Sequence, residues 1–244
     1  MKIKLDLHIH SLRSPDGCMS LEEIIARAKA AGLQGCAVCD HDLPPEDLPE
    51  FPDFLLIPGI EVSTPQGHLL GYFIRGPVPS GDLFTAAEEI HRQGGLAVLA
   101  HPFARHNQPQ RLEPYVSALD GIEVFNSRAP RKNPQANVLA RVFAQKHRLF
   151  PTAGSDAHVP QEIGNAFVEL KVNNLSQESV KAALWAGNAQ CGGLESPHRY
   201  VAQSQRRKLL RRHAGPLAWG KWLLFSAKCQ AEDLLKRKDR ASCL

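Results

Sequence analysis

The chain has 244 residues, 43% of them hydrophobic and 22% charged, with a net charge of +4; this is the composition of a globular protein long enough for one α/β-barrel domain or two small domains. Its N-terminus carries charged and imidazole side chains where a signal peptide needs an apolar run, and no segment approaches the roughly 18 apolar residues of a membrane span. Six scattered cysteines do not form the framework of a small secreted domain, so we expect a cytoplasmic protein without a membrane span.

Over residues 1–195, short apolar runs alternate with helical patterns, which is typical of βα units and a parallel sheet. The run 3–9 alternates apolar and polar residues and predicts a strand, and Ser20 to Glu23 form a capping box that opens a helix ending near Gly32. Further apolar runs are 36–39, 55–60, 69–74, 96–100, 122–125, 150–153 and 166–170. Further helices are expected at 82–94, at 133–147 with Asn133 as cap and Pro134 as first residue, and at 176–186.

These patterns give about seven strands with helices between them, and they make a (β/α) barrel the first choice of fold. An open doubly wound sheet is the second choice, and periodicity alone does not separate the two. The alternation stops near Ser196.

Charge divides the chain at the same place. Residues 1–195 contain 17 Lys and Arg against 22 Asp and Glu, whereas residues 196–244 contain 12 against 3. We therefore expect a domain over 1–195 that carries the chemistry, followed by a basic, amphipathic and helical C-terminal extension over 196–244. This extension can be a solvated helix that covers the barrel, an arm that attracts polyanions, or a surface-binding segment that uses its Trp and Phe residues.

Histidine and carboxylate residues recur where the apolar runs end, and in an α/β barrel the carboxyl ends of the strands form the active face. His8 and His10 lie two apart on a strand, so both imidazoles point to one face. Imidazole and carboxylate ligands suit Mn, Fe or Zn, and the set is too large for one ion. The candidate ligands are His8, His10, Asp16, His41, Glu61, His68, His101, Asp156 and His158.

The ordered motifs DLHIHS, CDHD, GIEVST, HLLGY, AHPF, IEVFNSR and GSDAH resemble those of the PHP (polymerase and histidinol phosphatase) family over roughly residues 1–195. The resemblance implies a distorted (β/α)7 TIM-like barrel that binds three divalent metal ions through the nine candidate ligands. Asp16, together with the short spacing from Glu61 to His68, is similar to the small stand-alone branch of the family. That branch includes hydrolases of nucleoside 3′,5′-bisphosphates and of short oligonucleotides.

These observations predict a metal-dependent phosphoesterase that hydrolyses phosphate monoesters, of nucleotides or oligonucleotide ends, by attack of a metal-activated hydroxide on phosphorus. His101 or His158 is expected to protonate the leaving group. Asp40 is the third residue of the expected catalytic set. Asp40 and Asp42 flank the candidate ligand His41, and they either orient an imidazole or merely form a turn.

Four polar residues are expected to bind the substrate's phosphate. Arg13, Arg105 and Arg128 each follow a ligand-bearing or motif strand, and guanidinium binds phosphate bidentately. Arg128 is the strongest candidate because the resemblance puts its loop over the substrate, and Asn126 joins it there.

Two alternatives stay open. The substrate can be another small phosphorylated metabolite, such as a sugar phosphate or histidinol phosphate. The protein can also be a metal-stabilised module without catalysis that holds nucleic acid through its basic tail, although the full ligand set argues against this.

Overall fold

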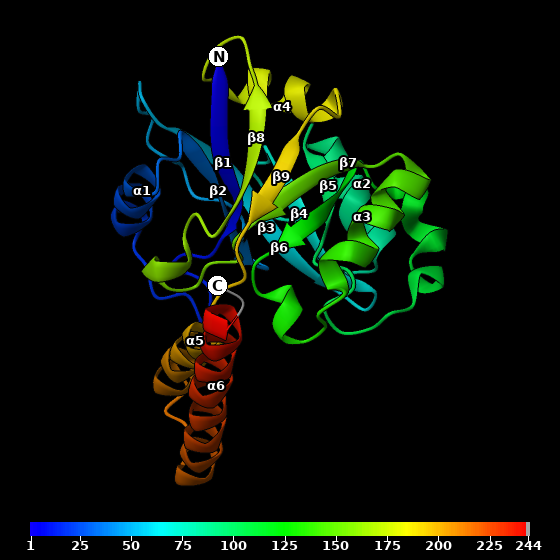
Figure 1. Ribbon diagram of the computed structural model, residues 1–244. Coiled ribbons are helices and arrows are strands. Elements are labelled where there is room, and N and C mark those ends of the chain that lie inside the picture. The colour runs from blue at the N-terminus through cyan, green and yellow to red at the C-terminus, as the bar shows by residue number, and fades with distance from the viewer. Residues whose placement is uncertain (243–244) are drawn as a thin grey trace.

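The computed structural model describes residues 1–242, with side chains through Leu235, and its centre is one mixed sheet of nine strands (Figure 1). The strands follow the order β7-β6-β5-β4-β3-β2-β1-β8-β9. Their bounds are β1 Lys2–Ile9, β2 Gly35–His41, β3 Leu55–Thr64, β4 Gly67–Tyr72, β5 Leu96–Ala100, β6 Gly121–Asn126, β7 Phe150–Gly154, β8 Ala166–Lys171 and β9 Gln190–Gly193.

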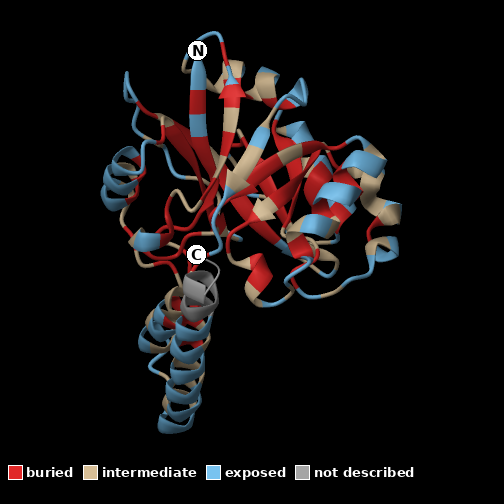
Figure 2. Ribbon diagram, viewed as in Figure 1, coloured by how far each residue is buried: buried red, intermediate tan, exposed pale blue. Residues whose placement is uncertain are grey.

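The sheet curls into a nearly closed barrel, which confirms the predicted fold class. A bridge between Ile9 and Ala157 joins the end of β1 to the segment after β7, so β7, which stands at one end of the strand order, also lies beside β1. The buried strands enclose the core, and the helices around them are exposed on their outer faces (Figure 2).

The prediction of a parallel sheet is correct for β1-β2-β3 and β5-β6-β7 and wrong for the remaining pairs. Strand β4 runs antiparallel to both β3 and β5, and β8 runs antiparallel to both β1 and β9. Only Pro65 and Gln66 join β3 to β4, and a parallel partner would need a crossover of a dozen or more residues. The Gly-rich strand β9 has no apolar alternation, so sequence periodicity could not predict it.

Four helices pack around the barrel, and two follow it. Their bounds are α1 Leu21–Ala30, α2 Leu83–Arg92, α3 Ala136–His147, α4 Gln177–Trp185, α5 His198–Arg211 and α6 Pro216–Ser242. The predicted capping box is present at α1, where Ser20 and Glu23 cap each other's backbone N–H groups. The predicted start of α3 is wrong by two residues: Oδ1 of Asn133 accepts from the backbone N–H of Gln135 at 3.1 Å, but this bond closes a turn before the helix, which begins at Ala136.

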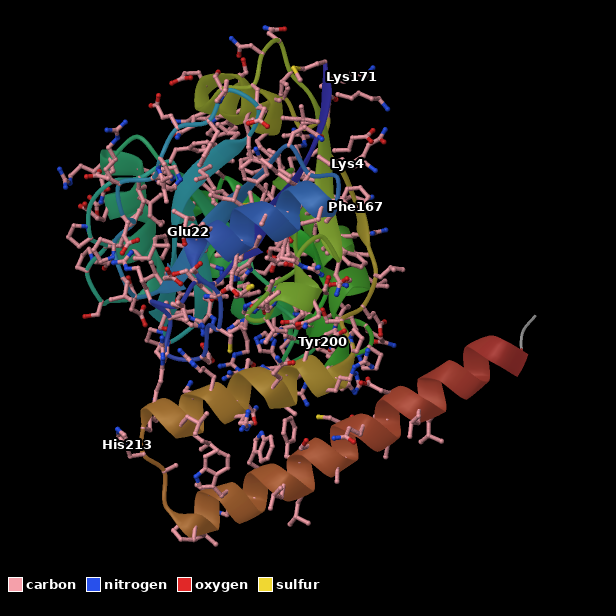
Figure 3. The ribbon with its side chains drawn as sticks, turned by 90° about the vertical axis from the view of Figure 1, so that its left-hand side faces the viewer. Lys4, Glu22, Phe167, Lys171, Tyr200 and His213 are labelled. Carbon is pink, nitrogen blue, oxygen red and sulfur yellow. The ribbon has the colours of Figure 1, made fainter. Side chains whose placement is uncertain are left out.

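The helical C-terminal extension is confirmed as a pair of antiparallel helices, α5 and α6, which we call the C-terminal hairpin. Helix α5 lies across the end of the barrel, and the turn at His213 leads into α6 on its outer side (Figure 3). The guanidinium of Arg211 donates to the carbonyls of Leu12 and Ser14, and the indole of Trp222 donates to the carbonyl of Ala202 at 2.8 Å. These bonds fix the hairpin on the barrel and its helices on each other. Among the described residues, no helix is long and apolar enough to cross a membrane.

Candidate metal centre and its cleft

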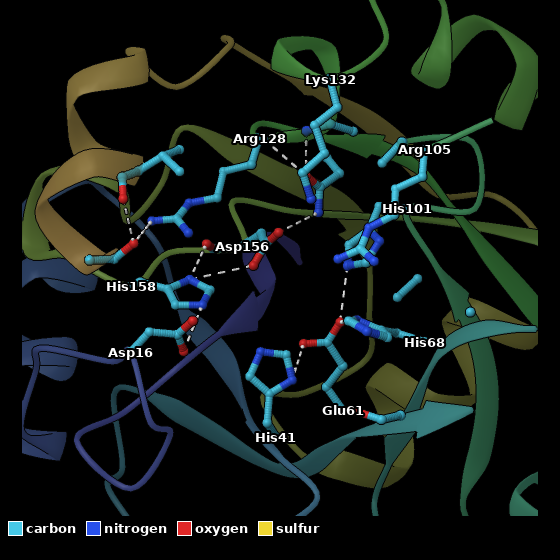
Figure 4. Close-up of a pocket in the computed structure, with 18 of the residues that line it drawn as sticks. Asp16, His41, Glu61, His68, His101, Arg105, Arg128, Lys132, Asp156 and His158 are labelled. Atoms are coloured by element: carbon cyan, nitrogen blue, oxygen red, sulfur yellow. Dashed lines mark hydrogen bonds and ion pairs between the residues drawn. The ribbon is translucent and has the colours of Figure 1, made fainter. Parts of the chain in front are cut away.

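The nine candidate ligands meet at the end of the barrel that faces the C-terminal hairpin. They extend from the ends of strands β1, β2, β3, β5 and β7, from the beginning of β4 and from the loop after β1. Figure 4 labels all of them except His8 and His10. His8 and His10 are fully buried at the base of this cluster, and the other seven line a cleft above them. The structure therefore brings together a set of side chains that are spread over 150 positions in the sequence.

Glu61 lies at the middle of the cluster and contacts five histidines. Its Oε1 is 2.6 Å from Nδ1 of His68 and 3.0 Å from Nε2 of His101. Its Oε2 is 3.3 Å from His8, 3.1 Å from His10 and 3.2 Å from His41. A single buried carboxylate that faces so many imidazoles is well placed to bridge cations.

A second carboxylate, Asp156, lies on the other side of the His8–His10 pair. Its Oδ1 is 3.4 Å from Nε2 of His10 and 3.9 Å from Nε2 of His8. The third, Asp16, lies 3.4 Å from Nε2 of His158. The cluster contains four groups of three residues, and within each group the ligand atoms lie within 4.8 Å of one another. The groups are His10, His41 and His158; His8, His10 and Asp156; His8, Glu61 and His101; and His41, Glu61 and His68.

Hydrogen bonds behind the cluster fix which ring nitrogen of three histidines faces the site. Nδ1 of His8 donates to Oε1 of Glu123 at 3.0 Å, and Nδ1 of His158 donates to the backbone carbonyl of Asp156 at 2.8 Å. Because a carboxylate or carbonyl can only accept, the Nε2 lone pairs of these two rings point into the cluster.

His10 is fixed by a short chain of polar groups. Its Nδ1 is 3.1 Å from Oγ of Ser14, and that hydroxyl donates to Oδ1 of Asp40 at 2.8 Å. Since the single hydroxyl proton goes to Asp40, Nδ1 of His10 must be the donor to Ser14. The other oxygen of Asp40 accepts from Ser11 at 2.6 Å. Asp40 thus lies behind the cluster and acts on His10 only through Ser14.

Burial and mutual attraction shift the pKa values of the cluster. Burial would raise the pKa of Glu61 and Asp156, but the surrounding histidines hold both well below their usual range. Burial would lower the pKa of His10, but Asp156 and Glu61 raise it to about 9. Burial, followed by the nearby charge of Arg128, lowers the pKa of His158 to about 4. The carboxylates are therefore ionised at neutral pH and ready to accept cations.

Unusual backbone conformations occur at the site. Asp42, His101 and Asp156 have φ values of 54°, 28° and 56°, in a region that residues other than glycine rarely adopt. Gly154 must be a glycine for a different reason: a Cβ there would lie 2.2 Å from Cβ of His8. Such strain commonly persists where a functional arrangement requires it.

The donor set fits divalent metal ions. Oε2 of Glu61 and Oδ1 of Asp16 are buried and, among the described residues, have no hydrogen-bond partner, although imidazole nitrogens surround them. Buried acceptors without donors are costly unless a cation satisfies them. Six imidazoles and three carboxylates, without a thiolate, suit Mn, Fe or Zn.

The cleft above the cluster has a volume of about 980 Å³. Arg105, Asn126 and Arg128 line it, as predicted for substrate contacts, but two of them already have partners. The guanidinium of Arg128 donates to both oxygens of Glu162, at 2.8 and 2.5 Å, and the amide of Asn126 donates to Glu123 at 2.9 Å. Arg105 is exposed at the rim.

The structure does not bring Arg13 to this cleft. Its guanidinium donates to the carbonyl of Pro44 at 2.8 Å and pairs with Glu46 at 3.0 Å, in a smaller pocket beside α1. Asp40 lines the same smaller pocket and is 3% exposed.

Several residues at the site had no sequence signal strong enough to assign them a role. The alternation along β6 turns Glu123 inward, but its bond to His8 depends on the approach of β6 to β1. Ser14 appears as an ordinary loop serine until the folded loop places it under His10. Lys208 and Trp222 line the cleft from the C-terminal hairpin, and nothing in a basic amphipathic segment predicts which face meets the barrel.

Two family models match the amino-acid sequence. The model described as the PHP domain matches residues 6–64, and the model described as PHP-associated matches residues 134–189. These segments contain seven of the nine cluster residues; His68 and His101 lie between them and join the cluster through the fold.

An uncharacterised protein of Methanocaldococcus jannaschii is 31% identical over 189 residues, covering 72% of this chain and 73% of the relative. A two-domain protein of Bacteroides vulgatus that contains a predicted PHP-like metal-dependent phosphoesterase has a similar structure, with a TM-score of 0.63, 19% identity, and coverage of 85% of this chain and 70% of that one. A lesion-specific endonuclease of Pyrococcus furiosus is also similar, with a TM-score of 0.57, 19% identity, and coverage of 78% and 58%. The structural similarities show a shared fold, and together with the two family models they establish that this chain belongs to the PHP family.

Proposed function

We propose that this protein is a hydrolase of phosphate monoesters whose substrates are nucleotides or oligonucleotide ends. The observation that carries the proposal is the convergence of one buried carboxylate, two partly buried carboxylates and six imidazoles at the base of a cleft with basic side chains on its rim. The cluster would hold the divalent cations, and the rim would hold the phosphate of the substrate.

In this mechanism the nine cluster residues would hold three divalent ions. The ions, when bound, would lower the pKa of a water molecule and neutralise developing charge on the phosphoryl oxygens. Glu123, Ser14 and the carbonyl of Asp156 keep the Nε2 lone pairs of His8, His10 and His158 directed into the cluster.

His101 and His158 both border the cleft, so either imidazole is placed to give a proton to the leaving oxygen of the substrate. Arg105 and Lys132 lie on the rim above them and would contact the phosphate through their exposed cationic groups. Arg128, whose Nε and Nη2 already donate to Glu162, would contribute positive charge to the cleft.

The test is an assay of phosphate release by the purified full chain loaded with Mn²⁺, Fe²⁺ or Zn²⁺. The panel contains nucleoside 3′,5′-bisphosphates, short oligonucleotides with terminal phosphates, histidinol phosphate and sugar phosphates. A His8→Ala/His10→Ala variant should lose bound metal and activity together. A His91→Ala/His213→Ala variant, which changes two histidines away from the cluster, should keep both.

Preference for the nucleotides would support the proposed substrate class. Preference for histidinol phosphate or a sugar phosphate would replace it with the small-metabolite alternative. Metal binding without release of phosphate from any compound would contradict the hydrolase.

A further inference from the structure

We propose that the C-terminal hairpin forms one wall of the substrate cleft, and that the cleft binds the end of a single-stranded nucleic acid. Phosphates of the strand would contact basic residues of the barrel rim and the hairpin, and a base would stack on an aromatic ring of α6. The inference rests on the proposed function for the reacting phosphate, and it adds the part of the substrate that extends beyond it.

The cleft runs without interruption from the metal centre to the hairpin. Its lining includes His101 and Asp156 at the barrel end and Lys208, Lys221 and Trp222 on the hairpin. The volume of the cleft, about 980 Å³, lies at the upper end of the range for sites that hold a drug-sized ligand. One phosphoryl group at the metal centre would leave most of this space empty.

The hairpin also reaches the metal centre directly. Nζ of Lys208 lies 3.6 Å from Oδ2 of the candidate ligand Asp16, and the hydroxyl of Ser204 lies 3.4 Å from the guanidinium of Arg128. Arg211 anchors the same helix to the loop that carries Asp16. A strand whose end reaches the metal centre would therefore lie against α5.

The cleft contains an excess of positive charge that the protein does not neutralise. Among the residues whose side chains are described, no ion pair or side-chain hydrogen bond involves five of the basic groups that line it. These groups are Arg105, Arg111, Lys132, Arg212 and Lys221. Partial burial, followed by the charge of Arg105, lowers the pKa of Lys132. Cations held together in this way favour a ligand with several anionic groups over one with a single phosphate.

Two aromatic rings line the same wall. Trp222 and Phe225 lie one turn apart on α6, and both are partly exposed to the cleft. The hydrogen bond from Trp222 to Ala202 holds the indole in place, and the guanidinium of Arg131 lies 5.4 Å from the ring centre of Phe225. A basic groove with aromatic rings beside it is the arrangement that binds single-stranded nucleic acids through stacking and phosphate contacts.

The test measures binding of a fluorescently labelled oligodeoxythymidylate of about ten nucleotides to the full, Mn²⁺-loaded chain as salt is varied. In Arg212→Gln/Lys221→Gln, the loss of two phosphate contacts should weaken binding about tenfold or more and reduce the steepness of the salt dependence by about 1.4. The matched control is Arg206→Gln/Lys228→Gln, which removes the same charge from the hairpin outside the cleft. It should bind with nearly unchanged affinity and salt dependence.

The aromatic contact is tested with Phe225→Leu, which keeps an apolar side chain and removes no hydrogen bond of the hairpin. It should weaken oligonucleotide binding about tenfold and leave binding of inorganic polyphosphate unchanged. Equal losses in both double variants would overturn the cleft as the binding site. Polyphosphate that binds as tightly as the oligonucleotide, with no effect of Phe225→Leu, would overturn the assignment to nucleic acid, as would preferential binding of phosphatidylserine vesicles.

Hydrolysis of a small aryl phosphate by the same variants separates this inference from the proposed function. Wild type and all hairpin variants should hydrolyse it at similar rates, because one phosphate does not reach α6. An enzyme that hydrolyses the aryl phosphate but shows no cleft-dependent oligonucleotide binding refutes only the inference. Cleft-dependent binding without hydrolysis of any phosphate ester refutes only the proposed function.

Discussion

Replacing Glu123 by glutamine should weaken metal binding by changing the protonation of one histidine. Glu123 is 1% exposed, and its two oxygens have different partners. Oε2 accepts from the backbone N–H of His101 at 2.8 Å and from the amide of Asn126 at 2.9 Å, whereas Oε1 accepts only from Nδ1 of His8 at 3.0 Å. The glutamine amide has a single oxygen, and it keeps more hydrogen bonds if that oxygen takes the place of Oε2.

The amide nitrogen of the glutamine then faces His8 and donates to Nδ1. His8 must therefore move its proton to Nε2, the nitrogen that points at Glu61 and Asp156 and would bind a metal ion. Loss of such an orienting partner costs 10- to 100-fold in metal affinity, or about 1.4 to 2.7 kcal/mol. The metal-free protein should lose less, because one hydrogen bond is exchanged for another.

Metal affinity is measured by competition with a chelator, and the protonation of His8 by nitrogen NMR of the imidazole. The control is Asp6→Asn, which converts a different buried carboxylate, on β1 instead of β6, to an amide. Asp6 accepts from the backbone N–H groups of His8, Ser155 and Gly164 and does not contact the ring of His8, so its amide should cost stability without altering that ring. The reasoning is refuted if both variants bind metal equally well, or if Nδ1 of His8 keeps its proton in Glu123→Gln.

Three further predictions follow from the same geometry. Glu162→Gln removes the carboxylate charge that is paired with the 11%-exposed guanidinium of Arg128 and should lower the free energy of unfolding by about 3 to 5 kcal/mol in urea titrations; an unchanged midpoint would contradict the buried pair. Gly154→Ala places a Cβ 2.2 Å from Cβ of His8 and should reduce both thermal stability and bound metal, whereas a fully loaded, stable variant would argue against the close approach. The pKa of His10, raised to about 9 in the metal-free protein although burial opposes its charge, means that its proton competes with metal at neutral pH. Metal affinity should therefore rise from pH 7 to about 9 with release of one proton per chain from this group, and an affinity that is flat over this range would rule the competition out.

The helices and the central strands were predictable because their signals are local. The alternation in 3–9 and the reciprocal cap at Ser20 and Glu23 arise from residues that are neighbours in both sequence and space. Asn133 shows where this reasoning fails. Its Oδ1 accepts from the backbone N–H of Gln135, as a cap does, but its amide also donates to the carbonyl of Phe103, 30 residues away, and the helix begins only at Ala136. The sequence did not predict β9 for the opposite reason. Its own residues contain no strand pattern, and the strand forms because it pairs with β8.

The cluster residues were predictable from their positions at the ends of apolar runs, whereas the contacts that orient them were not. His8 and His10 share a face because a strand has a period of two, and this follows from the sequence alone. That Glu123 lies behind His8 and Ser14 behind His10 depends on how strands and loops pack. Arg13 resembles a phosphate ligand in sequence, but its loop turns the guanidinium toward Glu46. Side-chain direction in loops is decided by tertiary contacts that no local pattern encodes.

The departure from a parallel barrel is what allows His68 to join the cluster. His68 is the second residue of β4, and in a parallel strand it would lie at the end of the barrel opposite to Glu61, roughly 13 Å away for a strand of this length. Because β4 runs antiparallel, it begins at the active end. The register pairs Glu61 with Leu70 and Ser63 with His68, so Glu61 and His68 are diagonal neighbours on one face, and their side chains meet at 2.6 Å. The next pairing sets His68 opposite Ala100, which leaves His101, one residue further on, at the same rim. The antiparallel direction of β4 thus brings His68 to Glu61, and a barrel of parallel strands alone would have placed this imidazole out of reach.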